Sequence, residues 1–416
     1  MSSPSSKYNE IDRCRISGSS NLINILDLGA QELTGVFPRQ RSESVTKGPL
    51  QLVWCPDSGL LQLKQSYDLA EMYGDNYGYR SGLNASMVDH LQAKAREIQR
   101  LRSLSPGDLV VDVGSNDATF LKSYDSPSIQ RVGIDPTGCK FSRFYGDGIE
   151  LIPDFFSADT FRSQCGDKKA SILTSIAMFY DLEDPAAFVR DVASILADDG
   201  IWHFEQSYMP SMLRTNAYDT ICHEHLEYYS LGVVKKLLDS CELKILDVQM
   251  NAVNGGSFAV TAGKQENPLT PNKVVIDWLL RQEDRMGLGT INPYEHFAKG
   301  VFEHRDNLTD LVRGLVADGK KIIGYGASTK GNVLLQFCGL TEEDLPCIAE
   351  VNEEKFGAYT PGTRIPIVSE EEAHAMKPDY LLVLPWHFKA GILAREREFL
   401  AQGGKFIFPL PEIEIV

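Results

Sequence analysis

The amino-acid sequence predicts an α/β protein with doubly wound, mostly parallel sheets. Apolar, strand-like runs alternate with helical periods through the middle of the chain. The runs lie at 131–134, 171–175, 200–206 and 244–248, and the helical periods at 117–123, 184–197 and 231–240. Twice, a hydrophobic strand runs directly into a small polar loop, first near Gly114 and again near Gly324. In open α/β sheets such loops border the crevice where ligands bind.

Composition and charge narrow the class of protein. A chain of 416 residues, 43% hydrophobic and 24% charged, is an ordinary globular protein of two or three domains. The net charge of −16 argues against nucleic acid or an anionic membrane as a partner. No apolar run approaches the roughly 18 residues of a membrane span, and no signal peptide is visible. The eight scattered cysteines indicate reduced thiols of a cytoplasmic protein.

Three sections follow one another along the chain. Residues 1–66 are turn-rich and predict short strands, and residues 67–265 contain a helix at 83–101 and the alternating elements of the nucleotide-type sheet. Residues 266–416 predict a second, Rossmann-like α/β unit. Its expected helices lie at 272–284 and 297–318, and its later strands at 346–350, 379–384 and 405–408.

Two turns in the first section have the form of zinc knuckles, C-x-x-C-G, with the second cysteine replaced. Cys14 is followed by Ser17, and Cys55 by Ser58. Four thiolates bind zinc strongly, but a serine hydroxyl stays protonated and is a poor ligand. We therefore expect no stoichiometric zinc, and we expect the two turns to form without it.

The loop after the strand at 109–113 predicts an adenosine-type ligand. It has one glycine, Gly114, of the dinucleotide pattern G-x-G-x-x-G and lacks the others, which disfavours NAD. Asp135, after the next strand, is placed to accept hydrogen bonds from ribose hydroxyls. The candidate cofactor residues are Asp112, Gly114, Asn116, Asp117, Asp135, Pro136 and Ser175. The alternative is an ordinary strand–loop–helix turn.

The densest polar cluster is at 218–229 and contains His223, Glu224 and His225. Two imidazoles flanking a carboxylate can move protons near neutral pH. The spacing is not H-E-x-x-H, so a metalloprotease is excluded and no metal ligands are assigned. A polar surface loop is the alternative.

Three other segments are candidates for a substrate side. The exit of the fourth strand carries Met178 and Tyr180, with plain core as the alternative. Residues 254–257 form a tight turn between strands. The loop from Gly324 to Gly331 offers backbone N–H groups and the cation of Lys330, which suit a diphosphate, or it is a structural turn.

Taken in order, these segments resemble the three-part sugar C-methyltransferases of deoxysugar pathways, of the tetronitrose-pathway type. The matching segments are Cys14–Gly18, Ile25–Gly29, Pro49–Leu63, Tyr77–Gly82, Val110–Leu121, Tyr218–Leu231, Gly255–Ser257, Gly324–Asn332 and Pro378–Phe388. The resemblance implies a zinc-knuckle domain, a methyltransferase domain that binds S-adenosylmethionine, and a C-terminal Rossmann-like domain.

The resemblance also implies a reaction. A base removes the proton beside the ketone of a nucleotide-linked keto-deoxysugar, and the enolate carbon takes the methyl group. It implies His225 as the base and Glu224 as the group that orients it or contacts the sugar, with His223 as a third catalytic residue. The implied substrate-side residues are Tyr77, Tyr79, Tyr180, Asn254, Gly326, Ser328 and Lys330.

The sequence departs from the family pattern at several positions. Besides Ser17 and Ser58, Cys222 replaces a tyrosine, Met178 replaces a histidine and Ala118 replaces a glycine of the cofactor loop. These changes leave open an O-methyltransferase acting on a sugar or small metabolite, and a non-catalytic sugar-nucleotide binding protein. The sequence leaves monomer and dimer open as well.

Overall fold

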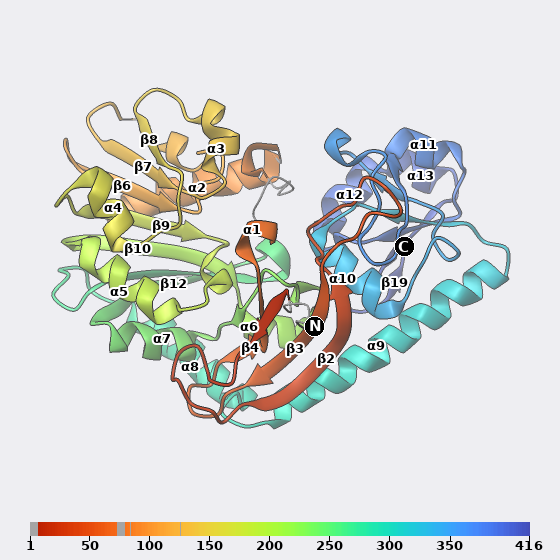
Figure 1. Cartoon of the computed structure of the whole chain (residues 1–416), viewed down its shortest axis with the longest axis horizontal. Helices are drawn as coiled ribbons and strands as arrows, with labels where there is room; N and C mark the ends of the chain where they lie inside the picture. Colours follow the sequence, from red (N-terminus) through yellow and green to blue (C-terminus); the bar gives the residue numbers. More distant parts are fainter. Residues whose placement is uncertain (1–6, 73–79, 84, 125) are drawn as a thin grey trace, which may run out of the picture.

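The chain forms two large mixed sheets with a smaller antiparallel sheet between them (Figure 1). The computed structural model describes residues 7–72, 80–83, 85–124 and 126–416. The α/β class and the Rossmann-like organisation that the sequence predicts are confirmed.

The first large sheet has seven strands in the order β12-β13-β10-β9-β6-β7-β8. The strands are β6 (Leu109–Val113), β7 (Gln130–Ile134), β8 (Ile149–Ile152), β9 (Ala170–Ile176), β10 (Leu196–Ser207), β12 (Leu243–Asn251) and β13 (Ser257–Lys264). The flanking helices are α2 (Ala85–Leu101), α3 (Gly138–Phe141), α4 (Ala158–Cys165), α5 (Pro185–Ile195) and α7 (Leu231–Ser240). Strands β6 to β10 pair in parallel, and only β13 among the seven runs against its neighbours. Every residue of β6 is buried, as expected for a strand covered on both faces.

One predicted helix of this sheet is wrong. The period at 117–123 yields only a single 3-10 turn, η2 (Leu121–Ser123). Asn116 and Ala118 adopt left-handed φ angles of 50° and 59°, which no helix tolerates. The Asp117 carboxylate also accepts hydrogen bonds from the backbone N–H and the hydroxyl of Thr119, so a local turn replaces the start of a helix.

The N-terminal section contributes longer strands than its turn-rich sequence predicts. Its strands are β1 (Tyr8–Glu10), β2 (Ile23–Glu32), β3 (Lys47–Trp54), β4 (Leu61–Leu63) and β5 (Gln65–Tyr67), followed by the short helix α1 (Leu69–Met72). Strand β2 spans 10 residues because a bulge absorbs its turn-like residues, with the Gly29 N–H donating to the Asp27 carboxylate. The four-stranded sheet is completed by β11 (Glu227–Tyr228), from the middle section, which pairs with β4.

The third section is the second α/β unit that the sequence predicts. Its six strands, in the order β16-β15-β14-β17-β18-β19, are β14 (Ile322–Tyr325), β15 (Ile348–Glu350), β16 (Ile367–Ser369), β17 (Tyr380–Val383), β18 (Lys405–Phe408) and β19 (Glu414–Ile415). Its helices are α10 (Thr329–Cys338), α11 (Glu370–Ala375), α12 (Lys389–Arg395) and α13 (Arg397–Ala401).

Two helices and a shared core join the sections. Helix α8 (Lys273–Met286) packs on the seven-stranded sheet, and α9 (Asn292–Ala317) runs from beneath β2 towards the C-terminal unit (Figure 1). One buried cluster includes Leu52 of β3, Tyr218 of the polar segment, Leu308 of α9 and Val333 of α10. The N-terminal sheet and the C-terminal unit therefore share a single hydrophobic core.

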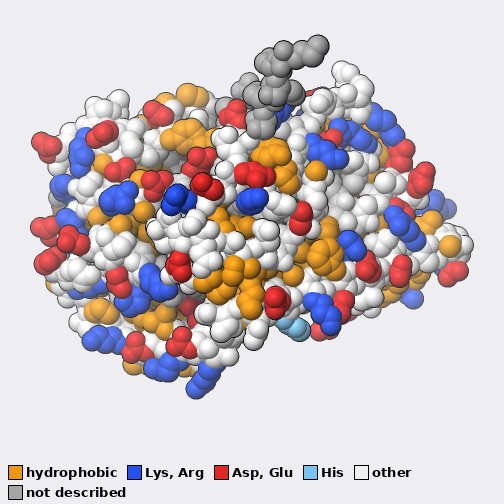
Figure 2. Space-filling model, turned by 60° about the horizontal axis from the view of Figure 1, so that its bottom comes forward, with side chains coloured by type: hydrophobic (Ala, Val, Ile, Leu, Met, Phe, Trp, Pro, Cys, Tyr) orange, Lys and Arg blue, Asp and Glu red, His pale blue; other side chains and the backbone are white. Residues whose placement is uncertain are grey.

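The surface carries charges of both signs. On the face drawn in Figure 2, acidic and basic side chains of the described residues are interspersed around hydrophobic ones. Within the described part of the chain, no helix has the length and apolarity needed to cross a membrane.

Candidate active site

The loop after β6 makes a tight turn at the carboxyl edge of the parallel strands. Gly114 has a φ of 75°, and a Cβ there would lie 3.1 Å from Met178 Cγ. A side chain at this position would be strained and would collide with the exit of β9. The loop and Met178 therefore face each other across a gap that only glycine leaves open.

Asp135 follows β7 and holds the loop in place. Its Oδ2 accepts from the Asn116 N–H at 2.7 Å, and its Oδ1 accepts from the Thr137 N–H at 2.7 Å and the Thr137 hydroxyl at 2.6 Å. A carboxylate has about four acceptor positions, so Oδ2 keeps one. Pro136, next in the chain, is half-buried beside it.

Asp112 and Ser175 lie beneath the loop. The Thr174 hydroxyl donates to Asp112 Oδ1 at 2.6 Å, and burial, reinforced by the charge of Asp135, raises the pKa of Asp112 to about 7. Ser175 is completely buried, and its hydroxyl accepts from the Trp202 indole N–H at 3.0 Å. The structure therefore engages Ser175 in the core rather than at the loop surface.

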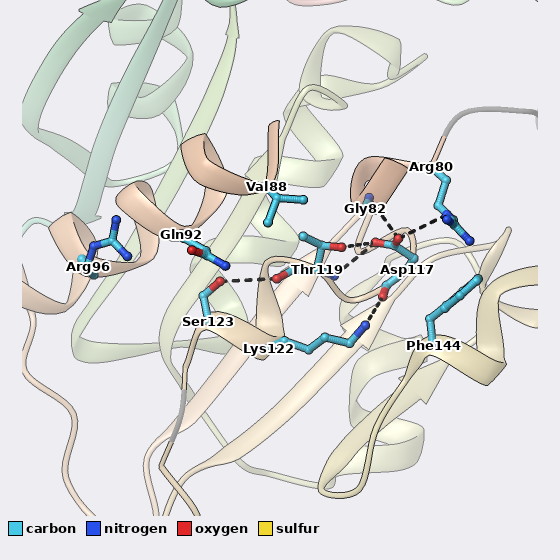
Figure 3. A pocket seen from close by; sticks show the side chains of 10 residues that line it. All are labelled: Arg80, Gly82, Val88, Gln92, Arg96, Asp117, Thr119, Lys122, Ser123 and Phe144. Atoms are coloured by element: carbon cyan, nitrogen blue, oxygen red, sulfur yellow. Dashed lines mark hydrogen bonds and ion pairs between the residues drawn. The ribbon is translucent and has the colours of Figure 1, made fainter. Parts of the chain in front are cut away.

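A cavity of about 520 Å³ opens on the α2 side of this loop (Figure 3). Asp117, whose carboxylate accepts from the Gly82 N–H at 3.0 Å, lies at its centre. The Arg80 guanidinium is 3.8 Å from that carboxylate and stacks 4.4 Å from the centre of the Phe144 ring. The lining residues are Arg80, Gly82, Val88, Gln92, Arg96, Asp117, Thr119, Lys122, Ser123 and Phe144. Its size and mixed charges suit a small, charged organic ligand.

His225 lies beyond the exit of β9, in the polar segment. Its Nδ1 is 2.9 Å from the carbonyl oxygen of Thr220. A carbonyl can only accept, so Nδ1 carries the proton and Nε2 keeps a lone pair. Burial and the nearby Lys330 lower the pKa of His225 to about 3, so the ring is neutral. The Tyr180 ring packs 4.3 Å from it, centre to centre.

Glu224 and His223 have different surroundings. Burial raises the pKa of Glu224, while the Cys222 thiol and the Thr34 hydroxyl oppose the shift. His223 is completely buried, with its ring edge-on to Tyr67 at 4.6 Å, and burial lowers its pKa to about 3. The structure thus places His223 in the N-terminal core and does not bring it to His225.

The C-terminal unit completes the far wall of the site. Lys330 is close enough for its charge to act on Asp219 and His225. It helps to lower the pKa of His225, and it partly offsets the burial that raises the pKa of Asp219. The Trp386 indole N–H donates to Asp219 Oδ2 at 2.8 Å. The polar segment at 218–229 and the glycine loop at 324–331 are therefore brought together, although about 100 residues separate them.

Several amides of that glycine loop are already used, including that of Gly326, which donates to the Ala349 carbonyl at 2.8 Å. The Ala327 N–H donates to Glu350 at 2.8 Å, and the Gly331 N–H donates to the Ser328 hydroxyl at 3.0 Å. Gly326 has a φ of 84°, and a Cβ there would lie 2.7 Å from Pro385. The loop geometry therefore leaves fewer amides for a diphosphate than its sequence suggests.

The side chains of three predicted site residues cannot be placed, and three residues that the sequence did not single out border the site. Tyr77 and Tyr79 lie outside the described residues, as does the side chain of Asn254, whose backbone belongs to η6 (Val253–Gly255) between β12 and β13. Arg80, Gly35 and Trp386 border the site without having been singled out from the sequence. Nothing local in the sequence distinguishes them, because only the tertiary fold brings them here.

The knuckle turns form and converge. The Cys14 Sγ lies 3.2 Å from the Ser58 hydroxyl, and the Cys55 Sγ lies 3.6 Å from the Ser17 hydroxyl. None of the eight cysteines is in a disulfide. Across the described residues, no three His, Cys, Asp or Glu side chains are grouped to hold a metal ion. The two serines thus occupy the positions where two further thiolates would complete a tetrahedral site.

This convergence gives a testable expectation. The double variant Ser17→Cys/Ser58→Cys should bind about one zinc per chain, because four thiolates then share one centre. Metal analysis of purified protein measures this, with Ser126→Cys/Ser128→Cys as a control that adds two exposed thiols elsewhere. The parent protein should bind no stoichiometric zinc, and one zinc per parent chain would contradict our reading of the serines.

The fold, together with the loop after β6, defines a methyltransferase that uses S-adenosylmethionine. Family models match three consecutive parts of the chain: "Putative zinc binding domain" at residues 14–73, "Methyltransferase domain" at 87–248 and "C-methyltransferase C-terminal domain" at 252–411. The C-methyltransferase NovU of Streptomyces niveus is 32% identical over 414 residues, covering 98% of this chain and 97% of NovU. The chain belongs to the family of three-domain, S-adenosylmethionine-dependent C-methyltransferases.

Solved structures resemble parts of the chain more weakly. The complex of the Haloferax volcanii Trm112 methyltransferase activator with its methyltransferase gives a TM-score of 0.36 at 16% identity, covering 44% of this chain and 93% of that one. Magnesium protoporphyrin IX methyltransferase of Synechocystis PCC 6803 gives a TM-score of 0.31 at 15% identity, covering 43% of this chain and 78% of that one.

Proposed function

We propose that this enzyme methylates a ring carbon of a nucleotide-linked keto-deoxysugar through an enolate. The observation that carries the proposal is the protonation state of His225, whose Nδ1–H is held by the Thr220 carbonyl so that Nε2 is free to accept a proton. The base is also connected to the cofactor loop. Met178 faces Gly114, and Tyr180, two residues further on, packs against the His225 ring.

The cofactor loop offers the groups that S-adenosylmethionine requires. Asp135 Oδ2 retains an acceptor position for a ribose hydroxyl, and Gly114 leaves its backbone open to a ligand. Arg80 and Asp117, in the cavity beside the loop, carry charges opposite to those of an amino-acid carboxylate and ammonium group. When bound, the cofactor supplies an electrophilic methyl group on a sulfonium, and these residues would hold its ends.

His225 would remove the proton from the sugar carbon next to the ketone. The C–H bond breaks, its proton moves to Nε2, and its electron pair becomes the enolate. Lys330 is the nearby cation that can face the negative oxygen, and a positioned charge in a water-poor site stabilises such an oxygen strongly. Glu224 would contact a sugar hydroxyl. Burial raises the pKa of the Cys222 thiol, and the Met178 thioether has no proton to give, so neither side chain is assigned an acid–base role.

Exchange of deuterium tests this function. With S-adenosylhomocysteine bound and D₂O as solvent, the wild-type enzyme should replace the proton beside the ketone of a nucleotide-linked 4-keto-6-deoxysugar, as seen by NMR. The methylated product should carry a C–CH₃ group. Exchange requires the enolate, so an enzyme that forms an O–CH₃ product without exchange is an O-methyltransferase. A protein with no affinity for S-adenosylmethionine in calorimetry would instead be a binding protein.

A further inference from the structure

A turn of the N-terminal section touches Glu224. Strand β2 ends at Glu32, and the chain turns through Thr34 and Gly35, with the Val36 N–H donating to the Leu33 carbonyl. A Cβ on Gly35 would lie 2.5 Å from Glu224 Oε1 and 3.7 Å from the Thr329 hydroxyl. The bare backbone of Gly35 is therefore packed directly against the Glu224 carboxylate.

The backbone at Gly35 does not itself require glycine. Gly35 is not one of the residues with a left-handed φ, so alanine can adopt its conformation. What excludes a side chain is the Glu224 carboxylate alone. The contact is thus a specific feature of the site rather than a consequence of turn geometry.

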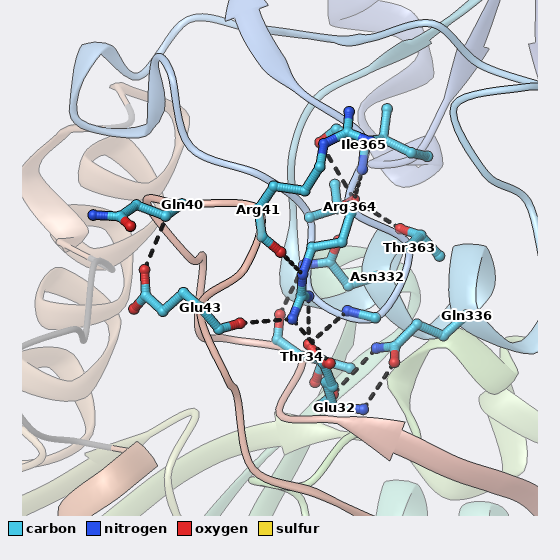
Figure 4. Close-up of polar contacts among 12 residues, drawn as sticks. Glu32, Thr34, Gln40, Arg41, Glu43, Asn332, Gln336, Thr363, Arg364 and Ile365 are labelled. Atoms are coloured by element: carbon cyan, nitrogen blue, oxygen red, sulfur yellow. Dashed lines mark hydrogen bonds and ion pairs between the residues drawn. The ribbon is translucent and has the colours of Figure 1, made fainter.

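The turn is fixed from the C-terminal unit at both of its flanks. The Glu32 carboxylate accepts two bonds from the Arg364 guanidinium, at 2.5 and 3.0 Å, and one from the Gly362 N–H at 2.8 Å (Figure 4). The Asn332 amide, completely buried, donates to the Thr34 carbonyl at 2.8 Å. The two parallel hydrogen bonds between Arg364 and Glu32 fix the orientation of the Glu32 carboxylate as well as its distance.

Helix α10 adds a second anchor. The Gln336 side chain accepts from the Glu32 N–H at 2.8 Å and donates to the Glu32 carbonyl at 3.1 Å. Arg364 also donates to the carbonyl oxygens of Arg41 and Glu43, at 3.1 and 2.9 Å. The same helix begins at Thr329 and carries Lys330, so the turn and the cation of the site are mounted on one element.

We propose that Gly35 and Arg364 are positioning residues, which hold the Glu224 carboxylate in the orientation that contacts the sugar. Arg364 acts through Glu32 and the Thr34–Gly35 turn, and Gly35 acts by direct packing. This inference rests on the proposed function in assigning Glu224 to the sugar. The N-terminal section thereby becomes part of the active site.

A double-mutant cycle tests the direct contact. Gly35→Ala should lower kcat/KM for the keto-sugar by at least about tenfold with S-adenosylmethionine affinity unchanged, because the new methyl group displaces Glu224. In a Glu224→Gln/Gly35→Ala double variant, the glycine change should add little to the loss from Glu224→Gln alone. Gly146→Ala, in open surroundings, is the control and should behave as wild type. Fully additive losses would overturn the proposal.

The anchor is tested in the same assay. Arg364→Gln should raise KM for the sugar and lower kcat, and Arg364→Lys should restore part of the loss. Lys299→Gln removes an exposed ion pair with Glu303 and should change neither. Thermal unfolding of each variant shows whether it remains folded.

Crystal structures of Gly35→Ala and Arg364→Gln give a readout that needs no substrate. A displaced Glu224 carboxylate supports the proposal, and an unmoved one overturns it. A wild-type enzyme that neither exchanges nor methylates keto-sugars would refute the proposed function instead, and would leave this structural result standing.

Discussion

Replacing His225 with asparagine is expected to reduce turnover by about 10²- to 10⁴-fold, the usual contribution of a general base. Asparagine can still donate to the Thr220 carbonyl, as the imidazole does, but it has no basic nitrogen. Affinity for S-adenosylmethionine should not change, because the substitution leaves intact the hydrogen bonds by which Asp135 holds Asn116 and Thr137 of the cofactor side. Steady-state kinetics and calorimetric titration measure the two effects.

The control for this variant is His296→Asn, on the exposed face of α9. The pH profile adds a second check. With a pKa of about 3, His225 is neutral and able to accept a proton throughout pH 5–8, so kcat/KM should show no loss of activity from its protonation in that range. Wild-type rates in His225→Asn would mean that the base is elsewhere.

Asp135→Ala should weaken S-adenosylmethionine binding by about 10- to 100-fold. A hydrogen bond to a charged group contributes about 1.5–3 kcal/mol, and each 1.4 kcal/mol is a tenfold change in affinity. The ribose loses its acceptor, and the Asn116 and Thr137 N–H groups lose the carboxylate that orders the loop. Titration calorimetry measures the affinity directly.

Asp159→Ala is the matched control, since that carboxylate is fully exposed on α4. It should bind the cofactor as wild type does. An Asp135→Ala protein that binds with unchanged affinity would show that the ribose contacts another residue.

The strand–loop–strand frame of the cofactor side could be predicted because its signals are local. The fully buried β6, the glycine that follows and the acidic residue after β7 lie within a short stretch of sequence. The missing helix at 117–123 could not be foreseen, since the apolar period is present and only the left-handed φ angles of Asn116 and Ala118 override it.

The acceptor side depends on contacts between distant parts of the chain. Lys330 was expected near a diphosphate, and folding places it close to His225. His223 was expected beside His225 but is buried against Tyr67. The pair between Glu32 and Arg364 joins residues more than 300 positions apart. No periodicity or motif encodes such a pairing, because it is decided only when the N-terminal sheet and the C-terminal unit share one core.

The pairing of β11 with β4 affects how the middle section would behave if it were expressed alone. Glu227 and Tyr228 lie within the polar segment at 218–229, and their backbone partners are Gln62 and Leu61. An isolated fragment of the middle section would present this strand with a bare row of N–H and C=O groups, a template for association with other chains. A fragment of residues 67–265 should therefore aggregate, whereas the full chain, in which β4 pairs with this strand, should stay monodisperse.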